Sequence, residues 1–198
     1  YYYVDEDTVY AALFVSSELE LPERGVTIVQ EAEVLAGGDT KFTVKGNATG
    51  LKLAVRIPSW ETAVPCVRKN GTYVETETRD GYMVVESLAD GDVIEVDFHM
   101  TVTAVPLPDA DNVFAFRYGP IVLSALLGTD KMWTTTTGMF VTVPGEKQVD
   151  TEVLTIAEEL GGVEEYIDDI ADYMEKDEDG LRFTLKGVNK ELVFVPHF

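Results

Sequence analysis

The sequence predicts a mostly β protein: two antiparallel β-sandwich domains in tandem, with one short acidic helix in the second. Three observations support this fold class. Apolar and polar residues alternate in several short stretches, of which Leu51–Ile57 is the clearest, and this period is typical of half-buried strands. Turn-forming residues such as Asn70-Gly71 separate the stretches. Apolar residues recur at helical spacing in a single stretch, Val163–Met174.

The first half of the chain follows the strand pattern throughout. Ser16–Gly25, which contains Pro22, is expected to be a loop. Strands are expected at Tyr1–Val4, Val9–Val15, Gly25–Leu35, Thr40–Lys45, Leu51–Ile57, Ala63–Val67, Tyr73–Thr78, Tyr82–Glu86 and Val93–Met100.

The stretch Leu51–Ile57 shows the alternation best. One face is predicted to carry Leu51, Leu53, Val55 and Ile57, and the other Lys52, Ala54 and Arg56. Pro58 ends the strand because proline cannot donate a hydrogen bond to the neighbouring strand. Pro65 lies within the next expected strand, Ala63–Val67, and indicates an edge position for it, and Asn70-Gly71 predicts a hairpin after it.

A domain boundary is expected within Thr101–Pro108, where two prolines interrupt the pattern, so the predicted domains are 1–103 and 104–198. The second domain is expected to hold an acidic helical insertion near 150–179, whose acids are interpreted as a solvated face. Its strands are expected in Val113–Leu127, which is broken at Gly119-Pro120, and at Phe140–Val143, Leu181–Leu185 and Leu192–Val195.

Composition excludes some classes of partner. The chain has 198 residues and a net charge of −21, which argues against binding to nucleic acids or to anionic membranes. No apolar stretch is long enough for a transmembrane helix. The single cysteine, Cys66, cannot form an internal disulfide and is expected to be a buried small hydrophobe rather than a nucleophile.

No motif predicts a catalytic or metal site within the chain. His99 and His197 lie near strand ends in different halves, which favours surface or packing roles. Residues 175–180 imitate the beginning of a calcium loop, but Lys186 occupies the position of the required glutamate. The chain has 36 acidic residues, so sequence alone nominates no carboxylate pair for glycoside hydrolysis.

Aromatic residues are the candidates for ligand contact. Exposed rings on a β-sandwich stack on sugar faces, whereas buried rings serve packing within or between domains, and both interpretations stay open here. The candidates for sugar or interdomain contact are Trp60, Tyr73, Tyr82 and Trp133.

Several motifs in order carry a family resemblance. They are YAALFVSS at Tyr10–Ser17, LAVRIPSW at Leu53–Trp60, Asn70-Gly71, Gly81-Tyr82, Gly91-Asp92 and FRYGPIV at Phe116–Val122. With these motifs the chain resembles the C-terminal β-sandwich region of glycoside hydrolase family 127, the β-L-arabinofuranosidase-like enzymes once known only as a domain of unknown function. The motif residues, all expected to be structural, are Arg56, Pro58, Ser59, Trp60, Asn70, Gly71, Gly91, Asp92, Arg117, Gly119 and Pro120. Arg56 is expected to reach a carboxylate or a carbonyl, and Trp60 to pack at a sandwich edge or against a missing domain.

The resemblance implies that an upstream α/α barrel performs the chemistry, with a zinc-bound cysteine nucleophile and a glutamate acid/base. This chain would then be a non-catalytic accessory region without a cofactor of its own. It would brace the barrel and contribute to a homodimer, in the cytoplasm rather than outside the cell. Two alternatives stay open: a carbohydrate-binding module, which requires exposed aromatic residues on one sheet face, and an adhesion-type interaction domain, which requires a protein partner.

Overall fold

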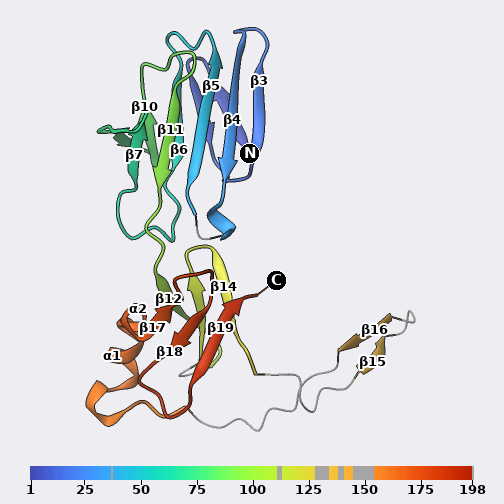
Figure 1. Ribbon diagram of the computed structural model, residues 1–198, viewed down its shortest axis with the longest axis vertical. Helices are drawn as coiled ribbons and strands as arrows, with labels where there is room; N and C mark the ends of the chain where they lie inside the picture. Colours follow the sequence, from blue (N-terminus) through green and yellow to red (C-terminus); the bar gives the residue numbers. More distant parts are fainter. Residues whose placement is uncertain (37, 111–112, 128–133, 138–140, 145–153, 198) are drawn as a thin grey trace. The chain divides into compact units, whose positions relative to one another are not determined.

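The computed structural model describes residues 1–36, 38–110, 113–127, 134–137, 141–144 and 154–197 (Figure 1). Two compact units divide the chain: Tyr1–Thr101 with Tyr118–Ile121, and Val102–Arg117 with Val122–Phe198. Strands far outnumber helices among the described residues, which confirms the predicted mostly β class. Among them no helix is long and apolar enough to cross a membrane.

The first sheet of the first unit has five strands in the order β1-β2-β6-β10-β9. Their bounds are β1 Tyr2–Asp5, β2 Thr8–Ala11, β6 Lys52–Arg56, β10 Tyr82–Val85 and β9 Glu77–Arg79. β2 and β6 run parallel, with Val9 opposite Leu53, and this corrects the expectation of purely antiparallel sheets. The parallel pair is possible because the intervening chain crosses to the other sheet.

The second sheet has six strands in the order β3-β4-β5-β11-β7-β8. Their bounds are β3 Ser17–Leu21, β4 Val26–Ala32, β5 Thr40–Gly46, β11 Val93–Asp97, β7 Cys66–Lys69 and β8 Thr72–Tyr73. A short 3₁₀ helix, η1 Val34–Ala36, follows β4. The loop expected at Ser16–Gly25 is wrong, because β3 pairs with β4 there and Pro22 lies just beyond the strand.

One apolar core joins the two sheets. It combines residues of the first sheet, such as Val9 and Met83, with residues of the second, such as Phe42 and Ile94. Leu51, Leu53 and Val55 are buried in it as the alternation predicted. The sheets form because each presents a continuous apolar face that only the other sheet can cover.

Three local predictions around the Asn70-Gly71 turn have different outcomes. The hairpin is confirmed, since Lys69 pairs with Thr72 across the turn. The edge position of the strand expected at Ala63–Val67 is wrong, because β7, which begins at Cys66, lies between β11 and β8. The single strand expected at Tyr73–Thr78 is also wrong: β8 belongs to the second sheet and β9 to the first.

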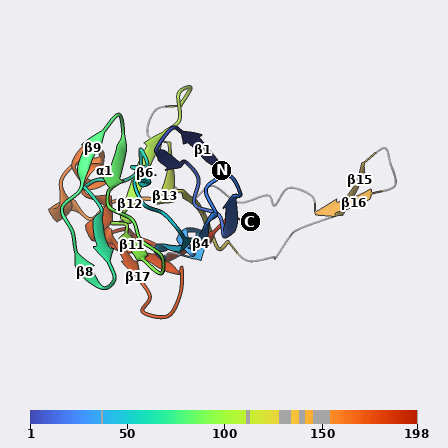
Figure 2. The ribbon, with the colours of Figure 1, turned by 90° about the horizontal axis from the view of Figure 1, so that it is seen from above.

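The second unit contains one six-stranded sheet in the order β12-β13-β14-β19-β18-β17. Their bounds are β12 Val102–Pro106, β13 Phe114–Tyr118, β14 Ile121–Ala125, β19 Leu192–Pro196, β18 Phe183–Leu185 and β17 Met174–Lys176. A separate hairpin joins β15 Thr134–Thr137 to β16 Val141–Pro144 (Figure 2). Within the described residues, this single sheet with short helices stands where the sequence predicted a second two-sheet sandwich.

The predicted acidic helix is two short helices, α1 Val163–Asp168 and α2 Ile170–Tyr173, preceded by the 3₁₀ helix η2 Glu158–Leu160. Tyr166 and Ile170 are buried, as the helical spacing predicted, whereas Met174 is buried in strand β17. The acidic side chains of the described residues from 154 to 179 are exposed. They therefore form the solvated face that the sequence indicated.

Candidate functional site

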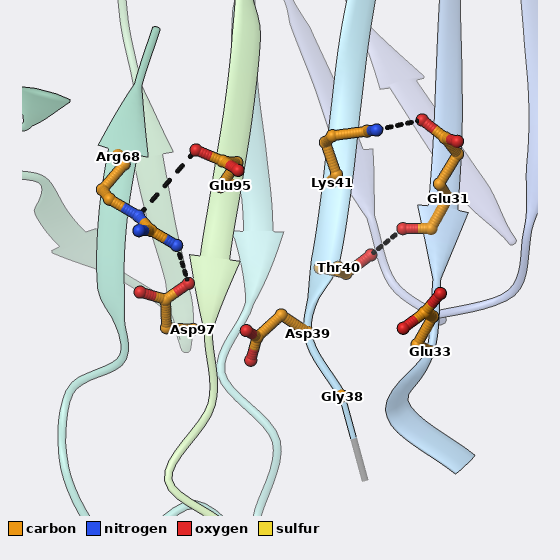
Figure 3. Close-up of a pocket in the computed structure, with 9 residues that line it drawn as sticks. All are labelled: Glu31, Glu33, Gly38, Asp39, Thr40, Lys41, Arg68, Glu95 and Asp97. Carbon is orange, nitrogen blue, oxygen red and sulfur yellow. Dashed lines mark hydrogen bonds and ion pairs between the residues drawn. The ribbon is translucent and has the colours of Figure 1, made fainter. Parts of the chain in front are cut away.

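A hollow of about 270 Å³ lies on the second sheet of the first unit (Figure 3). Its lining residues come from β4, β5, β7 and β11 and from the chain beside them: Glu31, Glu33, Gly38, Asp39, Thr40, Lys41, Arg68, Glu95 and Asp97. Three ion pairs join its lining residues, the longest of them between Arg68 Nε and Glu95 Oε2 at 3.8 Å. Lys41 Nζ lies 2.6 Å from Glu31 Oε2, and Arg68 Nη2 lies 2.7 Å from Asp97 Oδ1.

The environment of the Asp39 carboxyl in this hollow raises its pKa above the ordinary aspartate value. Partial burial raises the pKa of Asp39, and the negative charges of Asp97 and Glu95 raise it further, against the opposing effects of the Phe98 N–H and of Arg68. Among the described residues, no group of three or more histidine, cysteine or acidic side chains is arranged to hold a metal ion. The hollow contains neither an aromatic ring nor a histidine. It is therefore a charged surface with internal ion pairs.

The LAVRIPSW motif ends in a packed corner of the first unit. Pro58 is buried, Ser59 is exposed, and Trp60 is half-buried with its ring edge-on to Phe98, at a centroid distance of 5.3 Å. Gly119 of the FRYGPIV motif lies beside the same ring, because a Cβ on Gly119 would sit 3.5 Å from the Trp60 ring and 2.9 Å from Met100 Sδ. The fold thus brings together two motifs that lie far apart in the sequence.

The other nominated residues of these motifs differ in their exposure. Arg117 is exposed and Pro120 is half-buried. Arg56 Nε is shielded from solvent and has no hydrogen-bond acceptor among the described residues. The expectation that Arg56 reaches a carboxylate or a carbonyl is therefore not met at this atom.

Glu61, which sequence reasoning missed, fastens the loop after Trp60. Its side chain is fully shielded from solvent and accepts the backbone N–H of His99 at 2.9 Å. The ring of His99, which is 47% exposed, places Nδ1 3.5 Å from the other carboxylate oxygen. Nothing in the sequence distinguishes Glu61 from the other acids, since its burial depends on a partner 38 residues away.

The Asn-Gly and Gly-Asp motifs meet in a single hydrogen-bonded cluster. Asn70 Nδ2 donates to Asp92 Oδ1 at 2.8 Å, and Asn70 Oδ1 accepts the Val93 N–H at 2.8 Å. Asp92 Oδ2 accepts the Ala89 N–H at 2.7 Å and lies 2.8 Å from Lys69 Nζ. Burial alone would raise the pKa of Asp92, but these hydrogen bonds and the Lys69 charge lower it below its usual value. Gly71 and Gly91 supply the positive φ that the two turns require.

The aromatic candidates do not share one surface strip. Tyr73 lies on β8 of the second sheet, is 69% exposed, and has the Arg68 guanidinium carbon 5.9 Å from its ring centroid. Tyr82 lies on β10 of the first sheet beside Tyr10, which the sequence did not nominate. Trp133 lies outside the described residues.

Cys66 is exposed because it occupies the outward face at the start of β7. The prediction of a buried cysteine is therefore wrong.

Comparison with known proteins gives a consistent result. A family model described as the middle domain of the GH127 β-L-arabinofuranosidases matches residues 8–100. A GH127 β-L-arabinofuranosidase structure from Geobacillus stearothermophilus T6 is similar to 98% of this chain and to 32% of its own, with a TM-score of 0.58 and 17% identity. A second GH127 β-arabinofuranosidase structure covers 98% of this chain and 33% of its own, with a TM-score of 0.57 and 23% identity.

No curated protein matches the chain. At these identities the structural likeness concerns the fold alone. The chain spans about a third of the length of the solved structures that it matches. The comparisons confirm the resemblance that the motifs indicated.

Proposed function

We propose that this chain, whose residues 8–100 match the middle domain of glycoside hydrolase family 127, is a member of that family and braces the catalytic domain of a larger enzyme without performing catalysis itself. The match to a middle domain is the observation that carries the proposal. The chain's share of its structural relatives, about a third of their length, supports it. Hydrolysis would then belong to a part of the enzyme outside this chain.

Exposed apolar side chains supply the surface for such bracing. Several large apolar residues of the first unit are at least half exposed: Tyr1, Tyr3, Val4, Leu35, Val64 and Tyr73. Leaving them in water is unfavourable by about 25 cal/mol per Å² of apolar area, so a domain that covers several of them gains stability from the contact. The proposed contact is with the α/α barrel that the resemblance implies.

The first test measures hydrolysis. The full chain is incubated with 4-nitrophenyl β-L-arabinofuranoside beside a complete family 127 enzyme as the positive control. We expect no release above the buffer rate, because the carboxylate and the nucleophile would lie in the missing domain. A rate near that of the complete enzyme would overturn the non-catalytic role.

The second test measures bracing. The parent enzyme is prepared with and without the region equivalent to this chain, and the melting temperature of its catalytic domain is compared. We expect the truncated form to melt at a lower temperature because it exposes the apolar surface that the region covers. An unchanged melting temperature with full activity would contradict the bracing role.

Light scattering of the intact parent enzyme tests the proposed homodimer. Metal analysis of this chain tests our proposal that it needs no zinc.

A further inference from the structure

The outward face of the first sheet, which points away from the core, carries an ordered arrangement of side chains. One row crosses all five strands in register, through Tyr3, Tyr10, Ala54, Val84 and Glu77. Tyr82 begins the next row, opposite Arg56 on one side and Arg79 on the other. Aromatic and small apolar residues therefore occupy the middle of this face, and charged residues flank them.

Tyr10 and Tyr82 lean toward each other across the central strand. Their strands lie on either side of β6, two strand spacings or about 9.5 Å apart, and the two residues are also offset by two positions along the strands. Their ring centroids are nevertheless only 5.3 Å apart, at an interplanar angle of 85°. Ala54 of β6 lies opposite Tyr10 and two positions along the strand from Arg56, the partner of Tyr82, and it is fully shielded although it is on the outward face. The two half-buried rings thus form an aromatic wall on this face, beside a small residue.

A hollow of about 290 Å³ lies against this wall. It is lined by Asp5, Asp7, Thr8, Tyr10, Lys52, Glu77, Arg79, Asp80, Tyr82, Val84 and Glu86. This volume is at the lower end of the range for small-molecule sites. The lining combines two rings with hydroxyl, carboxylate, ammonium and guanidinium groups, so it can contact an apolar face and hydrogen-bond a polar rim of the same ligand.

The charges in the hollow are largely paired with one another. Lys52 Nζ lies 3.1 Å from Asp7 Oδ2 and 3.9 Å from Glu86 Oε1. Arg79 Nη2 lies 3.1 Å from Glu77 Oε1. Five acids and two bases line the hollow, so an anionic ligand is disfavoured, and a cationic ligand would compete with Lys52 and Arg79 for three of the five carboxylates. A neutral ligand with hydroxyl groups can donate to the remaining lone pairs of the paired carboxylates and accept from the remaining N–H groups of Lys52 and Arg79.

We propose that this hollow binds a neutral saccharide, with a sugar C–H face against the Tyr10–Tyr82 wall and sugar hydroxyls on the Asp7–Lys52–Glu86 and Glu77–Arg79 pairs. The wall supplies apolar contact, and the ion pairs supply both donors and acceptors at fixed positions. The site is distinct from the proposed bracing role and does not depend on it, because binding is measured on this chain alone.

The test is a titration of the ¹⁵N-labelled full chain, followed by amide chemical shifts. The probes are neutral arabinopentaose, xylopentaose and cellopentaose, the anionic tetragalacturonate, and the cation spermidine. We expect at least one neutral probe to give saturating shifts in β2, β6 and β10, with tetragalacturonate at least about tenfold weaker. No saturating shift with any neutral probe up to about 10 mM, shifts that map elsewhere, or spermidine as the only ligand of the hollow would each overturn the proposal.

Matched tyrosine variants locate the contact. Tyr82→Ala is expected to weaken binding about tenfold, whereas Tyr82→Phe keeps the ring and changes binding by about twofold or less. Tyr73→Ala is the control, because Tyr73 is an exposed tyrosine of the other sheet. The saccharide affinity of this variant should match that of the unmodified chain. Equal weakening by Tyr82→Ala and Tyr73→Ala would contradict the site. If Tyr82→Ala does not fold, Glu86→Gln, whose side chain is 63% exposed, replaces it with an expected loss of about threefold.

Discussion

At the scale of single residues, the Asn70–Asp92 cluster shows how two short motifs act as one structural unit. Each motif by itself is an ordinary turn. In the fold, the side chain of Asn70 joins Asp92 to the Val93 backbone while its own backbone takes a φ of 53°. Asparagine tolerates this conformation better than most residues and also supplies a donor and an acceptor.

We predict that Asn70→Ala lowers the free energy of unfolding by about 2 kcal/mol, because two side-chain hydrogen bonds are lost and Asp92 keeps fewer partners. Urea denaturation of the full chain measures it. Asn47→Ala is the matched control, since Asn47 makes one exposed local bond, 3.2 Å from the Thr49 N–H, and a loss of a few tenths of a kcal/mol is expected. Equal losses in the two variants would show that the cluster has no special role.

Two aspartates are predicted to give opposite pH responses. The lowered pKa of Asp92 means that its stabilisation is present above the ordinary aspartate pKa and is lost as the pH falls through the lower folded value. The raised pKa of Asp39 means that the fold is favoured below the ordinary value and loses stability as the pH rises through the folded one.

Melting temperatures between pH 3 and pH 7 test this pair. Asp92→Asn should have a lower melting temperature than the unmodified chain at pH 7, and this difference in melting temperature should become smaller toward pH 3. Asp39→Asn should melt at or above the parent chain at pH 7, because the amide removes a charge that burial and the neighbouring acids disfavour. Destabilisation at pH 7 by Asp39→Asn of the same size as by Asp92→Asn would contradict the assignment.

At the scale of elements, the end of β5 is held by a close approach of two backbones. Gly46 has a φ of 92°, and a Cβ at this position would collide with the carbonyl oxygen of Gly25. The Gly46 N–H also donates to Asp90 Oδ1 at 2.7 Å. The β4–β5 hairpin therefore needs glycine here for space as well as for conformation.

Gly46→Ala is predicted to lower the free energy of unfolding by about 3 kcal/mol or to prevent folding, because backbone must move to admit the methyl group. Gly50→Ala is the control: its φ is 75°, but nothing lies within 4 Å of the added Cβ, so only the conformational cost of about 1 kcal/mol is expected. Circular dichroism and urea denaturation of both variants measure the difference. Similar losses would argue against the steric explanation.

At the scale of the whole molecule, the dominant property is charge. The net charge of −21 arises from 36 acidic residues against 15 lysines and arginines. Repulsion among these acids destabilises the compact state. Salt weakens this repulsion, because it shortens the screening length from about 30 Å at 0.01 M to about 8 Å at 0.15 M.

We therefore predict that the melting temperature of the chain rises as sodium chloride increases over this range. Potassium chloride at equal ionic strength is the control, because screening depends on ionic strength rather than on the cation. A rise seen with only one of the two salts would indicate a specific cation site and would contradict this explanation. Differential scanning fluorimetry measures both series.

Local features of the fold could be predicted from the sequence because their causes lie within a few residues. The alternation in Leu51–Val55 places side chains on opposite faces regardless of strand order, and Asn70-Gly71 favours a hairpin by its own backbone preferences. The burial of Tyr166 and Ile170 likewise follows from helical spacing. The family motifs could also be identified from the sequence, because each is a short run of neighbouring residues.

Only the tertiary structure decided how distant segments meet, because strand order and sheet membership depend on contacts that no local pattern encodes. It placed β2 parallel to β6, made a strand of Ser17–Leu21 and sent β8 and β9 to different sheets. It also made Ala54 a shielded residue on an outward face, where the rings of Tyr10 and Tyr82 meet although these residues lie 44 and 28 positions from Ala54 in the sequence. The sequence determined which residues alternate and turn, and the packing of two sheets determined which of them form a surface together.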